Sequence, residues 1–339
     1  MKLATARDGS ADGRLMMVSR DLKSMASAAQ IAGTMQSALE HWDSVLPRLQ
    51  ELYEQLNAGA IASTEYMPQA LLAPLPRAWQ WLDASAFPSH GELMQRAFEL
   101  PPIPSNPPLM YQGLSHQFLA PTEDVPFSSQ ADGIDFEGEF GVITAPVAMG
   151  TPSAQAAPSI RLAVQVNDWS LRTIAPIEMK TGFGWIQAKP ACSMAPIAVA
   201  LDELDSHWIQ CRITATLQVE LNGKLFGKVP ASEMQFGFHE LIAHAARTRS
   251  LCAGTIIGSG TISSRASRVV GSCCIAEKRA IEMIDYGAPR TDYLRFGDRV
   301  AMNAFGGDRQ GPLFGTLNQR VVNAKICGAE QRPAPRSNS

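Results

Sequence analysis

Two glutamates set in an apolar segment place the strongest constraint on how this chain can fold. They are Glu137 and Glu139, in the run Asp135-Phe-Glu-Gly-Glu-Phe-Gly-Val-Ile143. Side chains two positions apart on a strand point to the same face, so the two carboxylates project together, roughly 6.5–7 Å apart along the backbone. Two like charges on an inward face are unfavourable unless a cation or a shared proton neutralises them. The alternative is a solvated strand edge, which would carry no chemistry.

The composition is that of a globular protein with a sizeable core. The chain has 339 residues, of which 45% are hydrophobic and 18% are charged, and its net charge is -3. This length suits one large domain, or one large domain with a smaller partner. Because no Lys/Arg-rich run occurs, neither nucleic acid nor an anionic membrane is expected as a partner.

The sequence also predicts a cytoplasmic location. No apolar run approaches the roughly 18 residues of a membrane span. Residues 1–22 carry charges and lack the apolar centre of a signal peptide. The six cysteines are scattered without a C-x-x-C pair, which is typical of free thiols in a reducing compartment.

Patterns along the chain predict a small N-terminal domain followed by a larger, mainly β domain. Residues 1–22 contain hairpin-type turns, and residues 27–57 have the apolar spacing of a helix that Pro47 would divide. Proline is dense over residues 65–108, which indicates a connection near residues 90–105. The expected parts are a small α/β domain over residues 1–100, a catalytic domain over residues 105–328 and a disordered tail over residues 329–339.

Strand signals dominate the larger domain, so the expected fold class is mainly β within an α+β protein. Residues 160–166 form an apolar run typical of a buried strand. Residues 209–221 alternate apolar and polar side chains and end in Asn222-Gly223, a strong hairpin signal. Residues 238–249 are predicted to form a helix.

Asp168 follows the strand predicted at residues 160–166 and is the third carboxylate of interest. Three carboxylates meeting at one interior point would require a divalent cation to offset their charge. Oxygen ligands favour Mg²⁺ or Mn²⁺, with Ca²⁺ also compatible, over zinc, which prefers His and Cys. The residues alone do not place Asp168 beside Glu137 and Glu139.

Five short motifs follow one another in order between about residues 105 and 325. They are Asp135-Phe-Glu-Gly-Glu-Phe-Gly-Val-Ile143, Val166-Asn-Asp-Trp-Ser-Leu-Arg172, Lys189 with Ser193 and Pro196 after it, Gly258-Ser-Gly-Thr261, and Phe296-Gly-Asp298. This series resembles the fumarylacetoacetate hydrolase family. The resemblance implies a mixed β-sandwich roll with a small N-terminal domain, commonly assembled as a homodimer.

The resemblance also assigns expected roles to single residues. Glu137, Glu139 and Asp168 fall on the family's metal carboxylates. Lys189 falls on the catalytic lysine that stands near the metal and stabilises negative charge on the substrate. The positions that line the substrate site correspond to Arg172, Ser193 (in place of the usual Thr) and Thr261.

One departure from the family concerns the general base. Long-chain members have a fourth metal-ligand Asp seven residues before a catalytic His. If His116 is that His, Leu109 occupies the Asp position, so the chain is expected to resemble three-ligand members. His116 is then the expected general base, and Glu277 the carboxylate that orients the base or a water. The alternatives are an ordinary loop histidine and a solvated glutamate beside Lys278 and Arg279.

These residues favour metal-assisted chemistry on a small anionic substrate. The first hypothesis is hydrolysis of a C–C bond in a diketo acid of the acylpyruvate, fumarylpyruvate or maleylpyruvate, or fumarylacetoacetate type, in aromatic-compound catabolism. A second is decarboxylation of a 2-oxo diacid such as oxaloacetate, or isomerisation or hydration of a 2-oxo-alkenoate. A third, from another class, is a non-catalytic metal- or ligand-binding module. In either enzyme, residues 111–132 are expected to close over the site as a lid.

Overall fold

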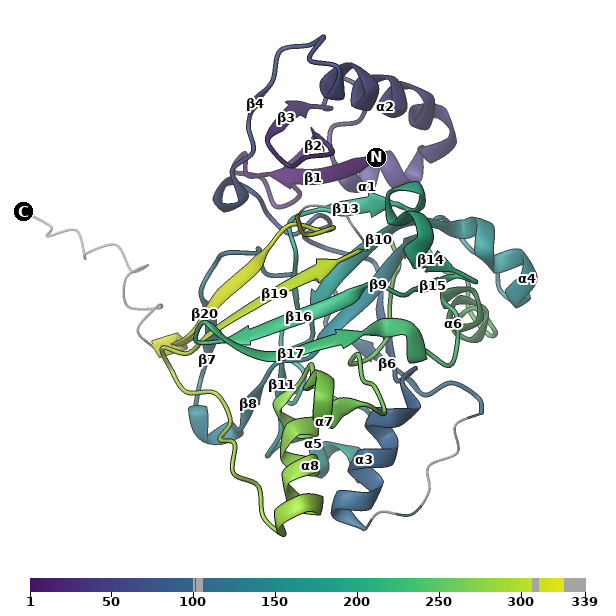
Figure 1. Cartoon of the computed structure of the whole chain (residues 1–339). Coiled ribbons are helices and arrows are strands. Elements are labelled where there is room, and N and C mark those ends of the chain that lie inside the picture. Colours follow the sequence, from purple (N-terminus) through teal and green to yellow (C-terminus); the bar gives the residue numbers. More distant parts are fainter. Residues whose placement is uncertain (100, 102–105, 307–310, 326–339) are drawn as a thin grey trace, which may run out of the picture.

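Two β-sheets and the helices around them form the body of the protein (Figure 1). The computed structural model describes residues 1–99, 101, 106–306 and 311–325. The predicted tail and part of the predicted connection near residues 90–105 lie outside these residues.

The larger sheet joins the N-terminal strands to strands from the rest of the chain. Its strands are β1 (Lys2–Ala6), β2 (Arg14–Val18), β3 (Ser24–Ser27), β4 (Thr64–Glu65), β5 (Trp81–Ala84), β6 (Met110–Gly113), β9 (Gly138–Thr144), β10 (Ile160–Asn167), β12 (Ser193–Met194), β13 (Ala198–Ala200) and β18 (Ile256–Gly258). They lie in the order β4-β3-β2-β1-β13-β10-β9-β18-β5-β6, and β12 pairs with β10. The pairing of β1 with β13 therefore makes the two parts one continuous sheet.

The second sheet covers one face of the first (Figure 1). Its strands are β7 (Val125–Phe127), β16 (Thr216–Leu221), β17 (Lys224–Pro230), β19 (Arg299–Phe305) and β20 (Leu317–Asn323), in the order β17-β16-β19-β20-β7. Two short pairs are β8 (Ile134–Asp135) with β11 (Ser170–Leu171), and β14 (Trp208–Ile209) with β15 (Arg212–Ile213). The hairpin predicted at Asn222-Gly223 is confirmed, because both residues have the positive φ, 52° and 73°, of a two-residue turn between β16 and β17.

Helices pack against the sheets and also lie at the lower end of the molecule as drawn in Figure 1. They are α1 (Met35–Glu40), α2 (Trp42–Asn57), α3 (Pro88–Phe98), α4 (Ser153–Ala156), α5 (Ala175–Met179), α6 (Phe238–Ala245), α7 (Ser267–Val270) and α8 (Ile275–Tyr286). The helix predicted over residues 27–57 is divided at His41 and not at Pro47, which lies inside α2. Among the residues that the structure describes, no helix has the length and apolarity that crossing a membrane requires.

Two apolar clusters fill the spaces on either side of the larger sheet. One lies between the sheets and includes Phe136, Phe140 and Leu217. The other packs α1 and α2 against the opposite face and includes Leu3 and Ile143. Since β9 contributes Phe140 to the first cluster and Ile143 to the second, it is buried on both faces, as its sequence predicted.

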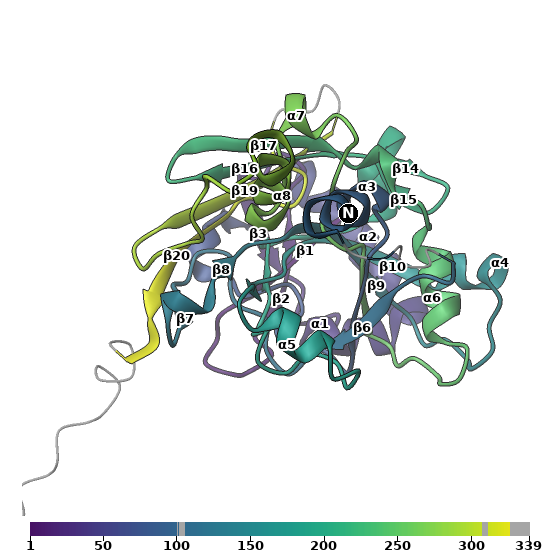
Figure 2. The same cartoon turned by 90° about the horizontal axis from the view of Figure 1, so that it is seen from below.

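β5 and α3 belong to the larger part of the protein, although both fall within residues 1–100. β5 pairs in parallel with β18 and antiparallel with β6. α3 packs against α8, and the two helices lie side by side in both views (Figure 2). Asp83 on β5 and His90 on α3 are thereby brought to elements that follow them by more than 170 residues.

Candidate metal centre and active site

Three buried carboxylates form the centre of the candidate site. Asp83, Glu139 and Asp168 each offer an oxygen, and these oxygens lie within 4.8 Å of one another. Glu139 lies on β9, and Asp168 directly follows β10, which is the neighbour of β9 in the sheet. The predicted meeting of Glu139 and Asp168 is confirmed, and the solvated strand edge is excluded because both residues have no exposed surface.

Asp83 lies on β5, and its carboxylate reaches the cluster across β18, the strand between β5 and β9. On β18, Gly258 stands opposite Gly141 on one side and opposite Asp83 on the other. A Cβ atom at Gly258 would lie 2.2 Å from Asp83 Oδ1 and 2.3 Å from a ring carbon of Trp81. Only glycine at position 258 leaves room for the Asp83 carboxylate in its present position.

The electrostatics of this cluster fit a divalent cation. Burial, reinforced by the charge of Asp168, raises the pKa of Asp83 to about 8. Burial and the neighbouring Asp83 carboxylate likewise raise the pKa of Glu139 well above its ordinary value. Within the described part of the chain, no group other than the Asp83 carboxyl is a hydrogen-bond partner of the two Glu139 oxygens. Such an all-oxygen donor set, whose carboxyl groups otherwise have to share a proton, is what Mg²⁺ or Mn²⁺ would satisfy.

Glu137 lies beside this cluster, but cations and hydroxyls already surround its carboxylate. Arg172 Nη2 donates to Oε1 at 2.5 Å and Lys189 Nζ donates to the same oxygen at 3.1 Å. Ser170 Oγ also donates to Oε1, and Thr261 Oγ1 donates to Oε2, each at 2.8 Å. Although burial alone would raise it, pairing with Lys189 and Arg172 holds the pKa of Glu137 below its ordinary value. The acidic group compatible with a metal thus contains Asp83 where the sequence suggested Glu137.

Lys189 connects Glu137 to the metal-compatible carboxylates. Its Nζ donates to Asp168 Oδ2 at 2.5 Å, and the residue is only 7% exposed, so it is not the surface lysine that its isolated position would suggest. The ammonium also lies 5.4 Å from the ring of Tyr111 and 5.6 Å from that of Trp185. Burial lowers the pKa of Lys189, whereas the carboxylates of Asp168 and Glu137 raise it. The effect of the carboxylates is the larger, so the ammonium group stays charged.

Asp168 has two further partners that the sequence did not indicate. Tyr111 Oη donates to Asp168 Oδ2 at 2.6 Å, and the Cys192 thiol lies 3.0 Å from Asp168 Oδ1. Tyr111 lies on β6, and β7 covers residues 125–127, so both sides of the segment predicted as a lid are anchored in the two sheets. Residues 114–124, between these strands, belong to no named helix or strand, and for them the lid stays a prediction.

The histidine that contacts Glu277 is His90, on α3. Its Nδ1 lies 3.1 Å from Glu277 Oε2, and Glu277 is fully buried in the first turn of α8. Glu277 is therefore not the solvated glutamate of the alternative interpretation. His116 is exposed, in the loop after β6.

The spacing that marks the fourth ligand is present after all, between Asp83 and His90. His90 follows Asp83 by seven positions, the interval expected for the metal-ligand Asp and its histidine. The acidic cluster has three members, and Asp83 is one of them, so an Asp with this spacing is present at position 83 and not at Leu109. The seven-residue interval is the signal in the sequence, and it falls within residues 1–100, the range predicted for the N-terminal domain.

The remaining predicted residues divide between the site and the core. Arg172 pairs with both Asp135 and Glu137, and Thr261 pairs with Glu137. Ser193 is fully buried on β12, where its Oγ accepts a hydrogen bond from Trp169 Nε1 at 2.8 Å. Its observed partner is therefore a packing residue.

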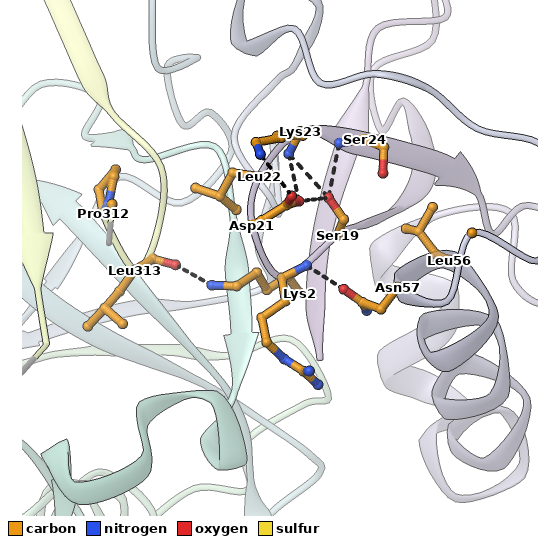
Figure 3. A pocket seen from close by; sticks show the side chains of 13 residues that line it. Lys2, Ser19, Asp21, Leu22, Lys23, Ser24, Leu56, Asn57, Pro312 and Leu313 are labelled. Carbon is orange, nitrogen blue, oxygen red and sulfur yellow. Dashed lines mark hydrogen bonds and ion pairs between the residues drawn. The ribbon is translucent and has the colours of Figure 1, made fainter. Parts of the chain in front are cut away.

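A separate open hollow of about 650 Å³ lies between the N-terminal strands and the segment around Leu313 (Figure 3). Lys2 Nζ donates to Leu313 O across it at 3.0 Å. None of the residues that line it belongs to the acidic cluster or its partners. The candidate site is thus defined by buried polar groups and not by this surface hollow.

Fold and site together define a two-sheet α+β protein whose interior holds a carboxylate cluster suited to a divalent cation. The family model described as "Fumarylacetoacetate (FAA) hydrolase C-terminal" matches residues 80–322, and the one described as "Fumarylacetoacetase N-terminal domain 2" matches residues 1–77. The chain belongs to the fumarylacetoacetate hydrolase family. The two matched segments meet at residues 78–79, so Asp83 and His90 lie in the C-terminal one.

Individual relatives are distant in sequence. An uncharacterised protein from Archaeoglobus fulgidus is 25% identical over 160 residues, which are 47% of this chain and 60% of that protein. Maleylpyruvate hydrolase from Sphingobium sp. SYK-6, solved with manganese(II) ion and pyruvate, matches with a TM-score of 0.66 at 15% identity, over 95% of this chain and 99% of that chain. The 5-carboxymethyl-2-hydroxymuconate delta-isomerase from Mycobacterium smegmatis matches with a TM-score of 0.58 at 17% identity, over 95% and 100%. At these identities the likeness shows a shared fold.

Proposed function

We propose that this protein is a metal-dependent hydrolase that cleaves a C–C bond in a small diketo acid of the acylpyruvate, maleylpyruvate, fumarylpyruvate or fumarylacetoacetate type, in aromatic-compound catabolism. The observation that carries the proposal is the buried cluster of Asp83, Glu139 and Asp168 with Lys189 against it. When bound there, Mg²⁺ or Mn²⁺ would supply Lewis-acid polarisation of a substrate carbonyl. The hydrolase from Sphingobium, which holds manganese and pyruvate in the same fold, supports this choice of cation and substrate class.

Two cations of the chain would bind and stabilise the anionic substrate. Lys189 and Arg172 both reach Glu137, so they present two positive charges beside the acidic cluster. A 2-oxo acid carboxylate is attracted to that pair, and Thr261 adds a hydroxyl donor. Lys189 is close enough to the cluster to stabilise the negative charge that develops on the carbon leaving group.

His90 is the proposed general base, in place of His116. Its Nδ1 faces Glu277, which fixes the orientation of the ring and leaves Nε2 for a proton. A histidine oriented by a buried carboxylate can take a proton from water as the water attacks the substrate carbonyl. His90 comes from α3 and Glu277 from α8, so the packing of these helices sets the position of the base.

Glu139→Gln tests the metal site directly. The amide keeps the shape of the side chain but removes the negative charge, so Mn²⁺ affinity should fall by at least about 100-fold and turnover should be lost. Calorimetric titration with Mn²⁺ and an assay of the diketo acids named above measure the two effects. Glu65→Gln, on the exposed strand β4, is the matched control and should change neither. Normal metal binding by Glu139→Gln would contradict the proposed centre.

A second candidate is isomerisation or hydration of a 2-oxo-alkenoate, or decarboxylation of a diacid such as oxaloacetate. The observation that favours it is Lys189, which would stabilise an enolate in all of these reactions, and the delta-isomerase from Mycobacterium smegmatis has the same fold.

His90→Ala separates hydrolysis from decarboxylation, because decarboxylation consumes no water and therefore needs no base to activate one. C–C hydrolysis should fall about 100-fold or more, whereas decarboxylation of oxaloacetate should change little. Equal loss of both activities would contradict the assignment of His90 as the base for water. The proposal also includes a cytoplasmic location and assembly of the protein as a homodimer. Light scattering measures the oligomeric state.

A further inference from the structure

Asp135 is a fully buried carboxylate outside the metal-compatible cluster, and its oxygens connect two parts of the site. Its exposed fraction is 0%, and it lies on β8, which pairs with β11. Its Oδ1 accepts the backbone N–H of Ile275 at 2.7 Å, and its Oδ2 accepts that of Ala276 at 2.9 Å. The same Oδ2 accepts Arg172 Nε at 2.8 Å. One side chain therefore holds both a helix end and a cation.

The helix end that Asp135 holds is the one that carries Glu277. Ile275 and Ala276 are the first two residues of α8, whose N–H groups have no partner within the helix. A carboxylate at this end also interacts favourably with the helix dipole. Glu277 is the next residue, and its carboxylate contacts His90. The position of the Glu277–His90 pair thus depends on where the first turn of α8 is fixed.

The cation that Asp135 holds is the one that contacts Glu137. Arg172 donates through Nε to Asp135 and through Nη2 to Glu137, so its planar guanidinium is fixed at two points. Its side chain is 16% exposed, so most of it is enclosed. Without Asp135, the guanidinium would keep one carboxylate and could rotate about it.

We propose that Asp135 is a positioning residue that holds Arg172 and the Glu277–His90 pair in a fixed arrangement around the acidic cluster. The catalytic consequence rests on the proposed function, whereas the link between Arg172 and the first turn of α8 does not. Substrate binding through Arg172 and proton transfer through His90 then depend on one carboxylate that touches neither substrate nor metal.

The first test measures the link without any substrate. Hydrogen exchange of the amides at residues 275–277 should quicken about tenfold or more in Asp135→Asn, because the Asn amide nitrogen cannot accept from Ala276 or Arg172. Arg172→Gln should also quicken exchange there, since it leaves the buried Asp135 charge without its cation. The double variant should exchange no faster than Asp135→Asn alone. Additive effects of the two substitutions, or no effect of Arg172→Gln on α8, would overturn the proposal.

The second test measures the consequence for the site. Calorimetry with pyruvate on the Mn²⁺-loaded protein should show about tenfold weaker binding for Asp135→Asn. Asp135→Asn should lower the affinity as much as Arg172→Gln, and the double variant no further. Thr34→Ala removes a helix cap in the N-terminal part and is the control for a general loss of stability.

The two tests distinguish the possible failures. Should Thr34→Ala weaken pyruvate binding as much as Asp135→Asn at the same loss of Tm, the role of Asp135 would be one of general stability and the proposal would be overturned. Should the wild-type protein bind no pyruvate and turn over none of the acids, the proposed function would fail. Coupled exchange at residues 275–277 would then still support the link through Asp135.

Discussion

Asp83 is the residue at which burial and metal binding compete most directly. Its carboxylate is buried against Glu139 and Asp168, so in the metal-free protein it favours the protonated form up to about pH 8. A cation that binds there must displace that proton. Proton release and metal uptake at this residue are therefore one equilibrium.

Metal binding and metal-free stability should consequently change with pH in opposite directions. The folded state keeps the Asp83 proton up to about pH 8, whereas in the unfolded chain the pKa is the ordinary 3.8. The free energy of unfolding of the metal-free protein should thus fall as the pH rises from about 4 to about 8. Over the same range the apparent Mn²⁺ affinity should rise, by up to about tenfold per pH unit for each proton released.

Asp83→Asn isolates the contribution of this carboxyl group. Urea unfolding in EDTA, repeated from pH 5 to pH 8, should show a flatter pH dependence for Asp83→Asn than for the wild type, because one raised pKa is gone. Mn²⁺ affinity should be lower in the variant and depend less on pH. Parallel curves for the two proteins would show that Asp83 ionises at its ordinary pKa.

At the scale of secondary-structure elements, three adjacent strands, β9, β18 and β5, position the carboxylates of the site. β18 and β5 run in parallel, and β18 and β9 are antiparallel. Because Gly258 occupies the middle of this arrangement, the Asp83 carboxylate can lie over β18 towards Glu139. The absence of a side chain at position 258 is as necessary to the cluster as the acidic residues.

Gly258→Ala should therefore damage the site through packing alone. The added methyl group would meet Asp83 Oδ1 and the Trp81 ring, so the free energy of unfolding should drop by about 1–3 kcal/mol, as in overpacked cores. Mn²⁺ affinity should fall as well, since the Asp83 carboxylate must move. Chemical denaturation and calorimetry measure both effects. Gly33→Ala, where a Cβ would meet no atom within 4 Å, should leave both nearly unchanged.

The pairing of these strands also shows which features of the site cannot be predicted from the sequence. The burial of Glu139 and the position of Asp168 at a strand end follow from local apolar patterns, and both are confirmed. The pairing of β5 with β18 joins segments about 175 residues apart, and no local pattern specifies it. Asp83 and His90 were missed for this reason, and a proline-rich segment between them and the glutamates suggested a domain boundary instead.

At the scale of the whole molecule, the N-terminal segment and the C-terminal segment that holds the acidic cluster share a sheet and a core. β1 pairs with β13, which pairs with β10, the strand that ends at the metal-compatible cluster. Leu3 and Met17 from the N-terminal strands lie in one apolar cluster with Ile143 and Val164 from β9 and β10. Because the two matched family segments share a sheet and a core, we expect them to unfold as one cooperative unit.

Leu3→Ala tests whether the N-terminal strands and the metal centre unfold together. Leu3 is fully buried, so its truncation should lower the free energy of unfolding by about 2–5 kcal/mol. Because the core is shared, far-UV circular dichroism and release of bound Mn²⁺ should follow one urea transition, displaced equally for both probes. Met67→Ala, at a position 41% exposed, is the control and should leave the transition where it is. If Leu3→Ala instead melted the N-terminal strands in a separate step while Mn²⁺ stayed bound, the two segments would be independent domains, and the pairing of β1 with β13 would contribute nothing to the site.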